Sequence, residues 1–106
     1  MTPDQRRKLL ELAGWTSKAW TQMAWHEELE THIDLLRPWS QWLAEQVADA
    51  VLEDWTIWSE GHGQVFSAYP SVDDCEHGHY GPTRAEAIEA MLENWITEKE
   101  AHDAKR

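Results

Sequence analysis

The alternation of apolar and polar positions is clearest over about residues 55–70, where it predicts a β-hairpin. Aromatic and β-branched residues dominate both arms of this stretch, as on a half-buried strand. Gly61 and Gly63 lie between the arms and can supply the positive φ angles of a tight turn. Pro70 has no amide donor, so the second arm ends there. A third short strand is expected around His77–Tyr80.

Four other segments carry apolar residues at helical spacing and predict helices. The last of them starts at Thr83, which with Glu86 fits a capping box. The first starts in the same way at Thr2, followed by Pro3 at the first helical position. The apolar residues that follow each start recur every three or four positions. The predicted helices span about residues 3–13, 21–36, 39–53 and 84–100.

Together these elements indicate an α+β fold, with a small antiparallel sheet of two or three strands packed with helices. A chain of 106 residues is expected to form one domain, residues 1–106. Within it, residues 16–37 are predicted to be a helical insertion. Two apolar stripes are expected to contact the sheet. They are Trp39, Leu43, Val47 and Val51, and Ile88, Met91, Leu92 and Trp95.

The formal net charge is −11, and most of the acidity lies in one part of the chain. Residues 40–103 hold two basic and fourteen acidic residues, whereas residues 1–39 hold five and six. Such a surface disfavours direct binding to nucleic acid and favours a protein partner with a basic surface. The alternative is a solvated face that only keeps the protein soluble. The candidate protein-binding residues are Glu45, Asp49, Asp73, Asp74, Glu76, Glu89 and Glu93.

Eight tryptophans are unusually many for a chain of this size. We expect most of them to fill the core of a small domain, because each indole can bury a large apolar area. The alternative is that some of them form an exposed binding surface. A short unpaired sheet edge also offers a surface on which a second copy of the chain could pair to give a homodimer.

No catalytic signature occurs in the sequence, so we expect a binding protein with no catalytic residues, no cofactor and no metal. Cys75, His77 and His79 are of types that can bind zinc. No second cluster with zinc-finger spacing accompanies them, and an exposed polar loop is favoured. Cys75 is the sole cysteine, and no signal peptide or membrane-spanning apolar run is present. A cytoplasmic location is expected, without a membrane partner.

Three short motifs resemble a family of small bacteriophage proteins of α-β-α sandwich type. They are Leu9–Trp15, Gln64–Tyr69 and Tyr80–Ile88. The resemblance implies a fold and a phage or prophage setting, but no known chemistry and no catalytic residues. In that setting we expect an anti-CRISPR-like inhibitor of a host defence protein, for example a CRISPR effector complex, in the host cytoplasm. Its acidic surface would occupy a basic site that normally holds nucleic acid.

A second resemblance gives a different function. Val65–Met91, with Ala-Tyr-Pro, a cysteine and then Gly-Pro-Thr-Arg-Ala-Glu-Ala-Ile, is similar to the antitoxin half of HicA/HicB-type pairs. It implies an antitoxin that neutralises a basic toxin. Those domains begin with the strand, whereas here a long segment precedes it. A small metal-dependent or Cys/His enzyme that uses the loop from Cys75 to His79 is the second alternative.

Overall fold

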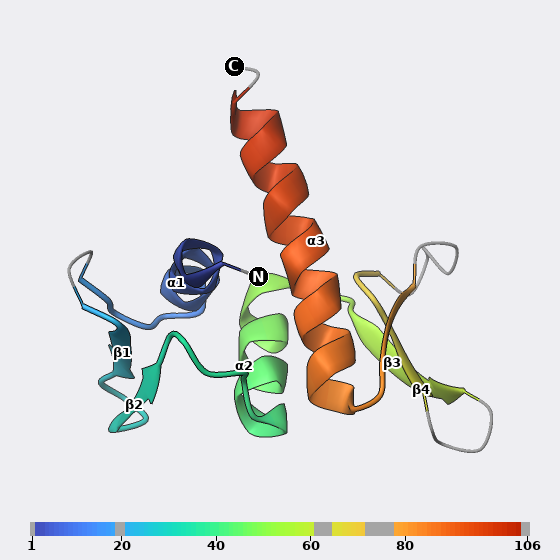
Figure 1. Cartoon of the computed structure of the whole chain (residues 1–106), viewed down its shortest axis with the longest axis horizontal. Coiled ribbons are helices and arrows are strands. Elements are labelled where there is room, and N and C mark those ends of the chain that lie inside the picture. Colours follow the sequence, from blue (N-terminus) through green and yellow to red (C-terminus); the bar gives the residue numbers. More distant parts are fainter. Residues whose placement is uncertain (1, 19–20, 61–64, 72–77, 105–106) are drawn as a thin grey trace.

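Three helices lie between two small antiparallel sheets in the computed structural model of the chain, which describes residues 2–18, 21–60, 65–71 and 78–104 (Figure 1). Figure 1 shows a two-stranded hairpin on one side, the helices in the middle and a three-stranded sheet on the other side. The molecule measures 42 × 35 × 21 Å, and the end of the longest helix projects beyond the body. The expected α+β class is confirmed.

The helices are α1, Pro3–Leu12; α2, Gln41–Val51; and α3, Arg84–Ala104. Helix α1 has the predicted capping box in full. The Gln5 amide donates to Thr2 Oγ1 at 3.1 Å, and the Thr2 amide donates to Gln5 Oε1 at 3.1 Å. The predicted helices 3–13, 39–53 and 84–100 are therefore present, with shifts of a few residues at their ends.

Side-chain hydroxyls also fix the starts of the other two helices. Ser40 Oγ accepts a hydrogen bond from the amide of Leu43 at 3.2 Å, at the start of α2. Thr83 Oγ1 accepts one from the amide of Glu86 at 3.1 Å, at the start of α3. Each hydroxyl satisfies one of the amides that have no partner inside a helix.

The three-stranded sheet has the order β3 (Thr56–Glu60), β4 (Val65–Tyr69) and β5 (His79–Gly81), all antiparallel. In the register, Ile57 lies opposite Ala68. The predicted hairpin and the third strand are thus confirmed, the latter one to two residues further along than expected. The glycine turn predicted between the two arms of the hairpin lies outside the described residues.

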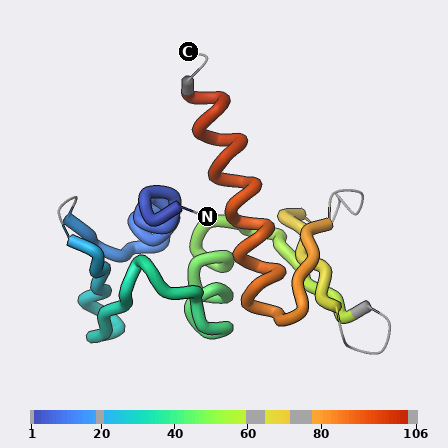
Figure 2. The backbone as a smooth tube through the Cα atoms, viewed as in Figure 1, coloured from blue at the N-terminus to red at the C-terminus, as the bar shows by residue number. Residues whose placement is uncertain are grey.

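Helix α3 packs across one face of this sheet, and α1 and α2 pack on the side of α3 that points away from the sheet (Figures 1 and 2). The apolar stripe predicted on α3 is buried, as Ile88, Met91 and Leu92 show. Helix α2 packs mainly against α3 and α1 rather than against the sheet, which corrects the expected contact. Trp42 is exposed on α2 although it has the spacing of the buried stripe.

The predicted helix over 21–36 is wrong, and so is the helical insertion at 16–37. This segment forms a hairpin of β1 (Met23–His26) and β2 (Thr31–Asp34), opposite the larger sheet. Thr16 adds a bridge, exchanging backbone hydrogen bonds with Trp25 at 2.8 and 2.9 Å. The buried positions are Ala24 and Leu35, whereas Leu29 and Leu36, which a helix over 21–36 would bury, are exposed.

Candidate interaction surface

Two of the predicted binding residues lie one turn apart on α2, and both contact other parts of the chain. Glu45 Oε1 is 3.0 Å from Arg84 Nη2, at the start of α3. Asp49 Oδ1 accepts a hydrogen bond from Trp55 Nε1 at 2.8 Å. Glu45 therefore links α2 to α3, and Asp49 links α2 to Trp55, directly before β3. Both carboxylates are also accessible to solvent.

On α3 the two predicted residues, Glu89 and Glu93, differ in their surroundings. Glu89 Oε1 accepts a hydrogen bond from the Trp39 amide at 2.9 Å and lies 3.9 Å from Arg6 Nη2. The side chains of Arg6 and Glu89 are only 14% and 15% exposed. Glu93 is exposed one turn further along. Glu89 is therefore a structural residue, and Glu93 is exposed to solvent.

The other three predicted residues, Asp73, Asp74 and Glu76, lie outside the described residues, together with Cys75 and His77. Among the residues that the structure describes, no group of three or more histidine, cysteine, aspartate or glutamate side chains is close enough to hold a metal ion.

The arginines of α1 are turned towards the protein rather than towards solvent. Arg6 Nη1 donates a hydrogen bond to the Leu35 carbonyl at 3.0 Å. Arg7 donates to Asp4 Oδ1 at 2.9 Å and to the Thr21 carbonyl at 2.9 Å. These bonds attach α1 to the open end of the β1–β2 hairpin, where the chain enters β1 and leaves β2. The short basic run of α1 is consequently part of the scaffold.

Other basic side chains also make contacts within the chain, but they remain exposed to solvent. Lys8 Nζ is 3.0 Å from Glu100, Arg37 is 3.9 Å from Asp34, and Lys99 Nζ is 5.2 Å from the Trp95 ring centroid. Many acidic side chains face solvent as well. They include Glu11, Glu27, Glu28, Glu30, Glu53, Asp54, Glu86, Glu93, Glu98 and Asp103. The described surface therefore carries many exposed carboxylates and fewer exposed basic side chains, as the net charge of −11 implies.

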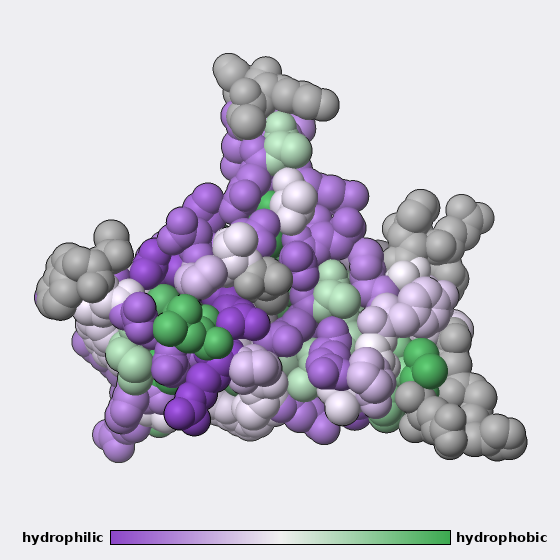
Figure 3. Space-filling model, viewed as in Figure 1, coloured by the Kyte–Doolittle hydropathy of each residue, from purple (hydrophilic) through white to green (hydrophobic). Residues whose placement is uncertain are grey.

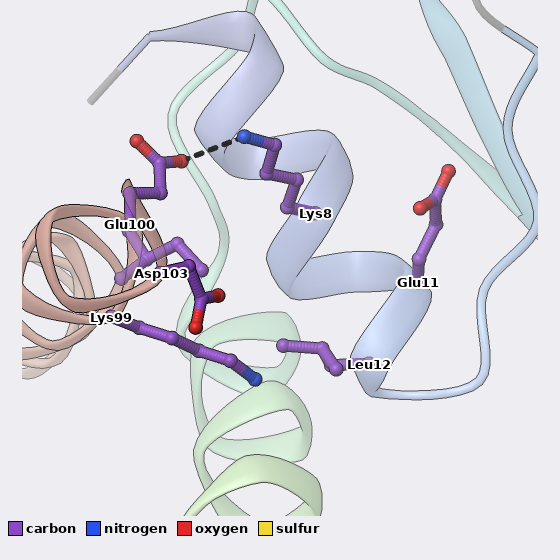
Figure 4. A pocket seen from close by; sticks show the side chains of 7 residues that line it. Lys8, Glu11, Leu12, Lys99, Glu100 and Asp103 are labelled. Atoms are coloured by element: carbon purple, nitrogen blue, oxygen red, sulfur yellow. Dashed lines mark hydrogen bonds and ion pairs between the residues drawn. The ribbon is translucent and has the colours of Figure 1, made fainter. Parts of the chain in front are cut away.

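A groove of about 250 Å³ lies between α1 and the projecting part of α3 (Figure 4). Leu12 and Lys99 point towards each other across it, and the pair of Lys8 and Glu100 closes one side. Its walls carry both signs of charge. The lining residues are Lys8, Glu11, Leu12, Ile96, Lys99, Glu100 and Asp103.

A second groove, also of about 250 Å³, lies beside the start of α2. Trp39 lines it, and the Nε1 of this indole is buried without a hydrogen-bond partner in the part of the chain that the structure describes. Arg37 and Asp34 at its rim lie 3.9 Å from each other. Neither groove brings together the predicted acidic residues.

The surface also carries exposed aromatic side chains, which the charge pattern does not indicate. They are Trp42, Trp58 and Tyr80. Strand alternation could have found Trp58, because Ile57 beside it faces the core. Figure 3 shows a mostly hydrophilic surface in this view, with small, separate apolar patches. The exposed aromatics thus lie on an otherwise polar, acidic surface.

No helix among the described residues is both long and apolar enough to cross a lipid bilayer. Comparison of the chain with family models, with curated protein sequences and with solved structures gave no match.

Proposed function

We propose that this protein binds the basic surface of another protein and thereby keeps nucleic acid from that surface. The observation that carries the proposal is the unequal use of charge. The arginines Arg6, Arg7 and Arg84 bond to groups within the chain, whereas most acidic side chains of the described residues face solvent. A surplus of outward negative charge attracts a basic partner over a distance and speeds its association.

Helix α3 offers the most regular part of this surface. Glu86, Glu93 and Glu100 recur every seven residues, so they follow one side of the helix about 10 Å apart. Glu100 is bound to Lys8, while Glu86 and Glu93 are exposed. Helix α3 is the longest helix, and its end projects from the body of the fold.

Two biological roles would use the same contact. An inhibitor of a host defence protein, in the manner of an anti-CRISPR protein, would cover a basic nucleic-acid site in the cytoplasm of the host. An antitoxin would cover a basic toxin. The partner distinguishes the two roles, since the physical act is the same in both.

The test is affinity capture from a nuclease-treated bacterial lysate at low and at high salt, with mass spectrometry of the retained proteins. We expect one basic, nucleic-acid-handling protein that is retained at low salt and lost at high salt, because salt screens exposed charges. The double variant Glu93→Lys/Glu98→Lys should also lose it. Both side chains are exposed on α3, so the fold should remain.

The matched control is Glu27→Lys/Glu28→Lys, which makes the same change of charge in the exposed turn of the β1–β2 hairpin. It should retain the partner. Capture of nothing at either salt contradicts the proposal, and a metal analysis would then examine the enzyme alternative. Equal loss in both double variants would indicate unspecific attraction to net charge.

A further inference from the structure

Strand β3 forms one edge of the three-stranded sheet and has a neighbouring strand on one side only. The strand order is β3-β4-β5, so β4 occupies that side. Among the described residues, no backbone group outside β4 hydrogen-bonds to Thr56–Glu60. The amides and carbonyls of β3 that point away from β4 therefore have no backbone partner in this part of the chain. An edge of this kind can pair with a further strand.

The packing of the helices leaves this edge accessible. Helix α3 packs mainly on β4 and β5 and touches β3 least. Trp58 and Ser59 are consecutive in β3, so their side chains point to opposite faces of the sheet. Trp58 is 52% exposed, and Ser59 is exposed as well. The sheet is thus open on both faces beside these residues, and side chains of an added strand meet no described helix there.

Strand β3 also lacks the features that usually block an edge strand. Such strands commonly carry proline or lysine, contain a bulge, or are very short. The sequence of β3 is Thr-Ile-Trp-Ser-Glu, with neither proline nor lysine. Its five residues pair with five consecutive residues of β4, so no bulge interrupts the strand. β-Branched and aromatic side chains favour strand pairing. The edge is therefore regular and suited to accept another strand.

The charge around this edge identifies what it accepts. The exposed Glu53 and Asp54 directly precede β3, and the strand ends at Glu60, so acidic residues stand at both ends. In an antiparallel pair of two copies, the start of each strand would lie beside the end of the other. Like charges would then meet at both ends, which destabilises the pair. A segment with basic residues at its ends would meet opposite charges instead.

We propose that the open edge of β3 binds an extended segment of the basic protein partner as an added β-strand. Backbone hydrogen bonds hold the segment along Thr56–Glu60, and its basic residues lie near the acidic ends of β3. A β-branched residue of the segment packs beside Trp58 on the same face. This inference rests on the proposed function, because it names the part of the partner that pairs with the acidic protein.

The experiment uses a peptide blocked at both ends, Lys-Thr-Val-Thr-Val-Thr-Lys, added to the full chain. Two matched peptides are controls. One has glutamate in place of both lysines, and the other has proline in place of both valines, which removes two amide donors. Hydrogen exchange of the β3 amides is followed by NMR. In the free chain the amides that point away from β4 should exchange fast. The lysine peptide should slow them about tenfold when about 90% of the chain is bound, because exchange then requires its release.

The variant Glu53→Lys/Asp54→Lys tests the charge argument. It should weaken binding of the lysine peptide about fivefold, because two attractions become repulsions. Glu53→Gln/Asp54→Asn removes the same charges without adding new ones and should have a smaller effect in the same direction. The matched control is Glu27→Lys/Glu28→Lys in the exposed turn of the β1–β2 hairpin, which should bind the peptide like the wild type.

Several results would overturn the proposal. They are unchanged exchange with the lysine peptide, equal binding of either control peptide, equal weakening by the two lysine variants, or slow exchange of all β3 amides in the free chain. Protection that rises with protein concentration alone would make the edge an interface between two copies. If lysate capture still responds to salt and to Glu93→Lys/Glu98→Lys, the proposed function stands and only the strand site fails.

Discussion

Gly81 is the residue at which β5 passes into α3, and the space around it excludes a side chain. A Cβ atom at this position would lie 2.6 Å from the Ala87 nitrogen and 2.9 Å from the Glu86 carbonyl carbon. Both are backbone atoms, so they cannot turn away as a side chain can. The close approach of the strand end to the first turn of the helix therefore requires glycine here.

We expect Gly81→Ala to lower the free energy of unfolding by about 1–3 kcal/mol, because the added methyl group forces the backbone apart. Urea denaturation followed by circular dichroism measures the change. Ser59→Ala, at an exposed position of β3, is the control and should change stability by less than about 0.5 kcal/mol. A Gly81→Ala variant as stable as the control would show that the strand-to-helix junction can widen.

Glu89 is a second residue whose contacts stabilise the fold. It accepts the Trp39 amide and faces Arg6, and both charged side chains are mostly withdrawn from water. We expect Glu89→Ala to reduce the free energy of unfolding by about 2–4 kcal/mol, since it leaves a donor and a charge without their partner. Glu89→Gln should lose about half as much, because an amide oxygen can still accept the Trp39 bond.

Thermal and urea denaturation of the two Glu89 variants, with the exposed Glu98→Ala as the control, measure the effect. If Glu89→Ala matched Glu98→Ala in stability, the contact with Trp39 would contribute nothing to the fold. Charge reversal at Glu89 is consequently a poor test of binding, because it disturbs folding first. Exposed positions such as Glu93 serve that purpose better.

The sequence predicted the acidic surface but not the contacts that its individual residues make within the fold. Net charge follows from composition, so an outward surplus of carboxylates was predictable. The partner of Glu89 is the amide of Trp39, 50 positions away. The partner of Glu45 is Arg84, 39 positions away. Such pairs exist only once helices have packed, and no local pattern in the sequence encodes them.

At the level of elements, local signals correctly predicted the larger sheet and three of the four expected helices, whereas the helix over 21–36 was wrong. Capping residues such as Thr2 and Thr83, and apolar stripes at helical spacing, act within a few residues and are visible in the sequence. The β1–β2 hairpin was missed because its turn contains no glycine or proline. Residues 27–30 read Glu-Glu-Leu-Glu, which are good helix formers. The buried pair Ala24 and Leu35 gave too weak an alternation to outweigh them.

That turn stores a small amount of strain. Glu30 has φ of 49°, a left-handed conformation that costs an L-residue free energy. We expect Glu30→Gly to raise the free energy of unfolding by about 0.5–1 kcal/mol, because glycine adopts this conformation without a steric penalty. The strain relieved should exceed the extra entropy that glycine gives the unfolded chain. The midpoint of urea denaturation measures the gain.

The control is Glu28→Gly in the same turn, which removes the same charge where no positive φ is present. It should lower stability slightly, since only the entropic cost of glycine remains. Equal effects of Glu28→Gly and Glu30→Gly would mean that loss of negative charge, rather than relief of strain, determines the stability of the hairpin.

For the whole molecule, charge acts on folding and on binding in opposite directions. With a net charge of −11, the folded chain repels itself. Added sodium chloride screens this repulsion over distances of about 10 Å or more. We therefore expect the melting temperature to rise by about 2–5 °C between low and high salt. Calorimetry at a series of salt concentrations measures the rise.

The variant Glu27→Gln/Glu28→Gln/Glu30→Gln isolates the cause, because it removes three exposed negative charges from one turn. Its melting temperature should rise less with salt than that of the wild type. A melting temperature that falls with salt would mean that attractive pairs such as Lys8 with Glu100 outweigh the repulsion. The same salt series should weaken capture of a basic partner. A loss of binding at high salt, while the fold becomes more stable, can therefore be attributed to the interface and not to unfolding.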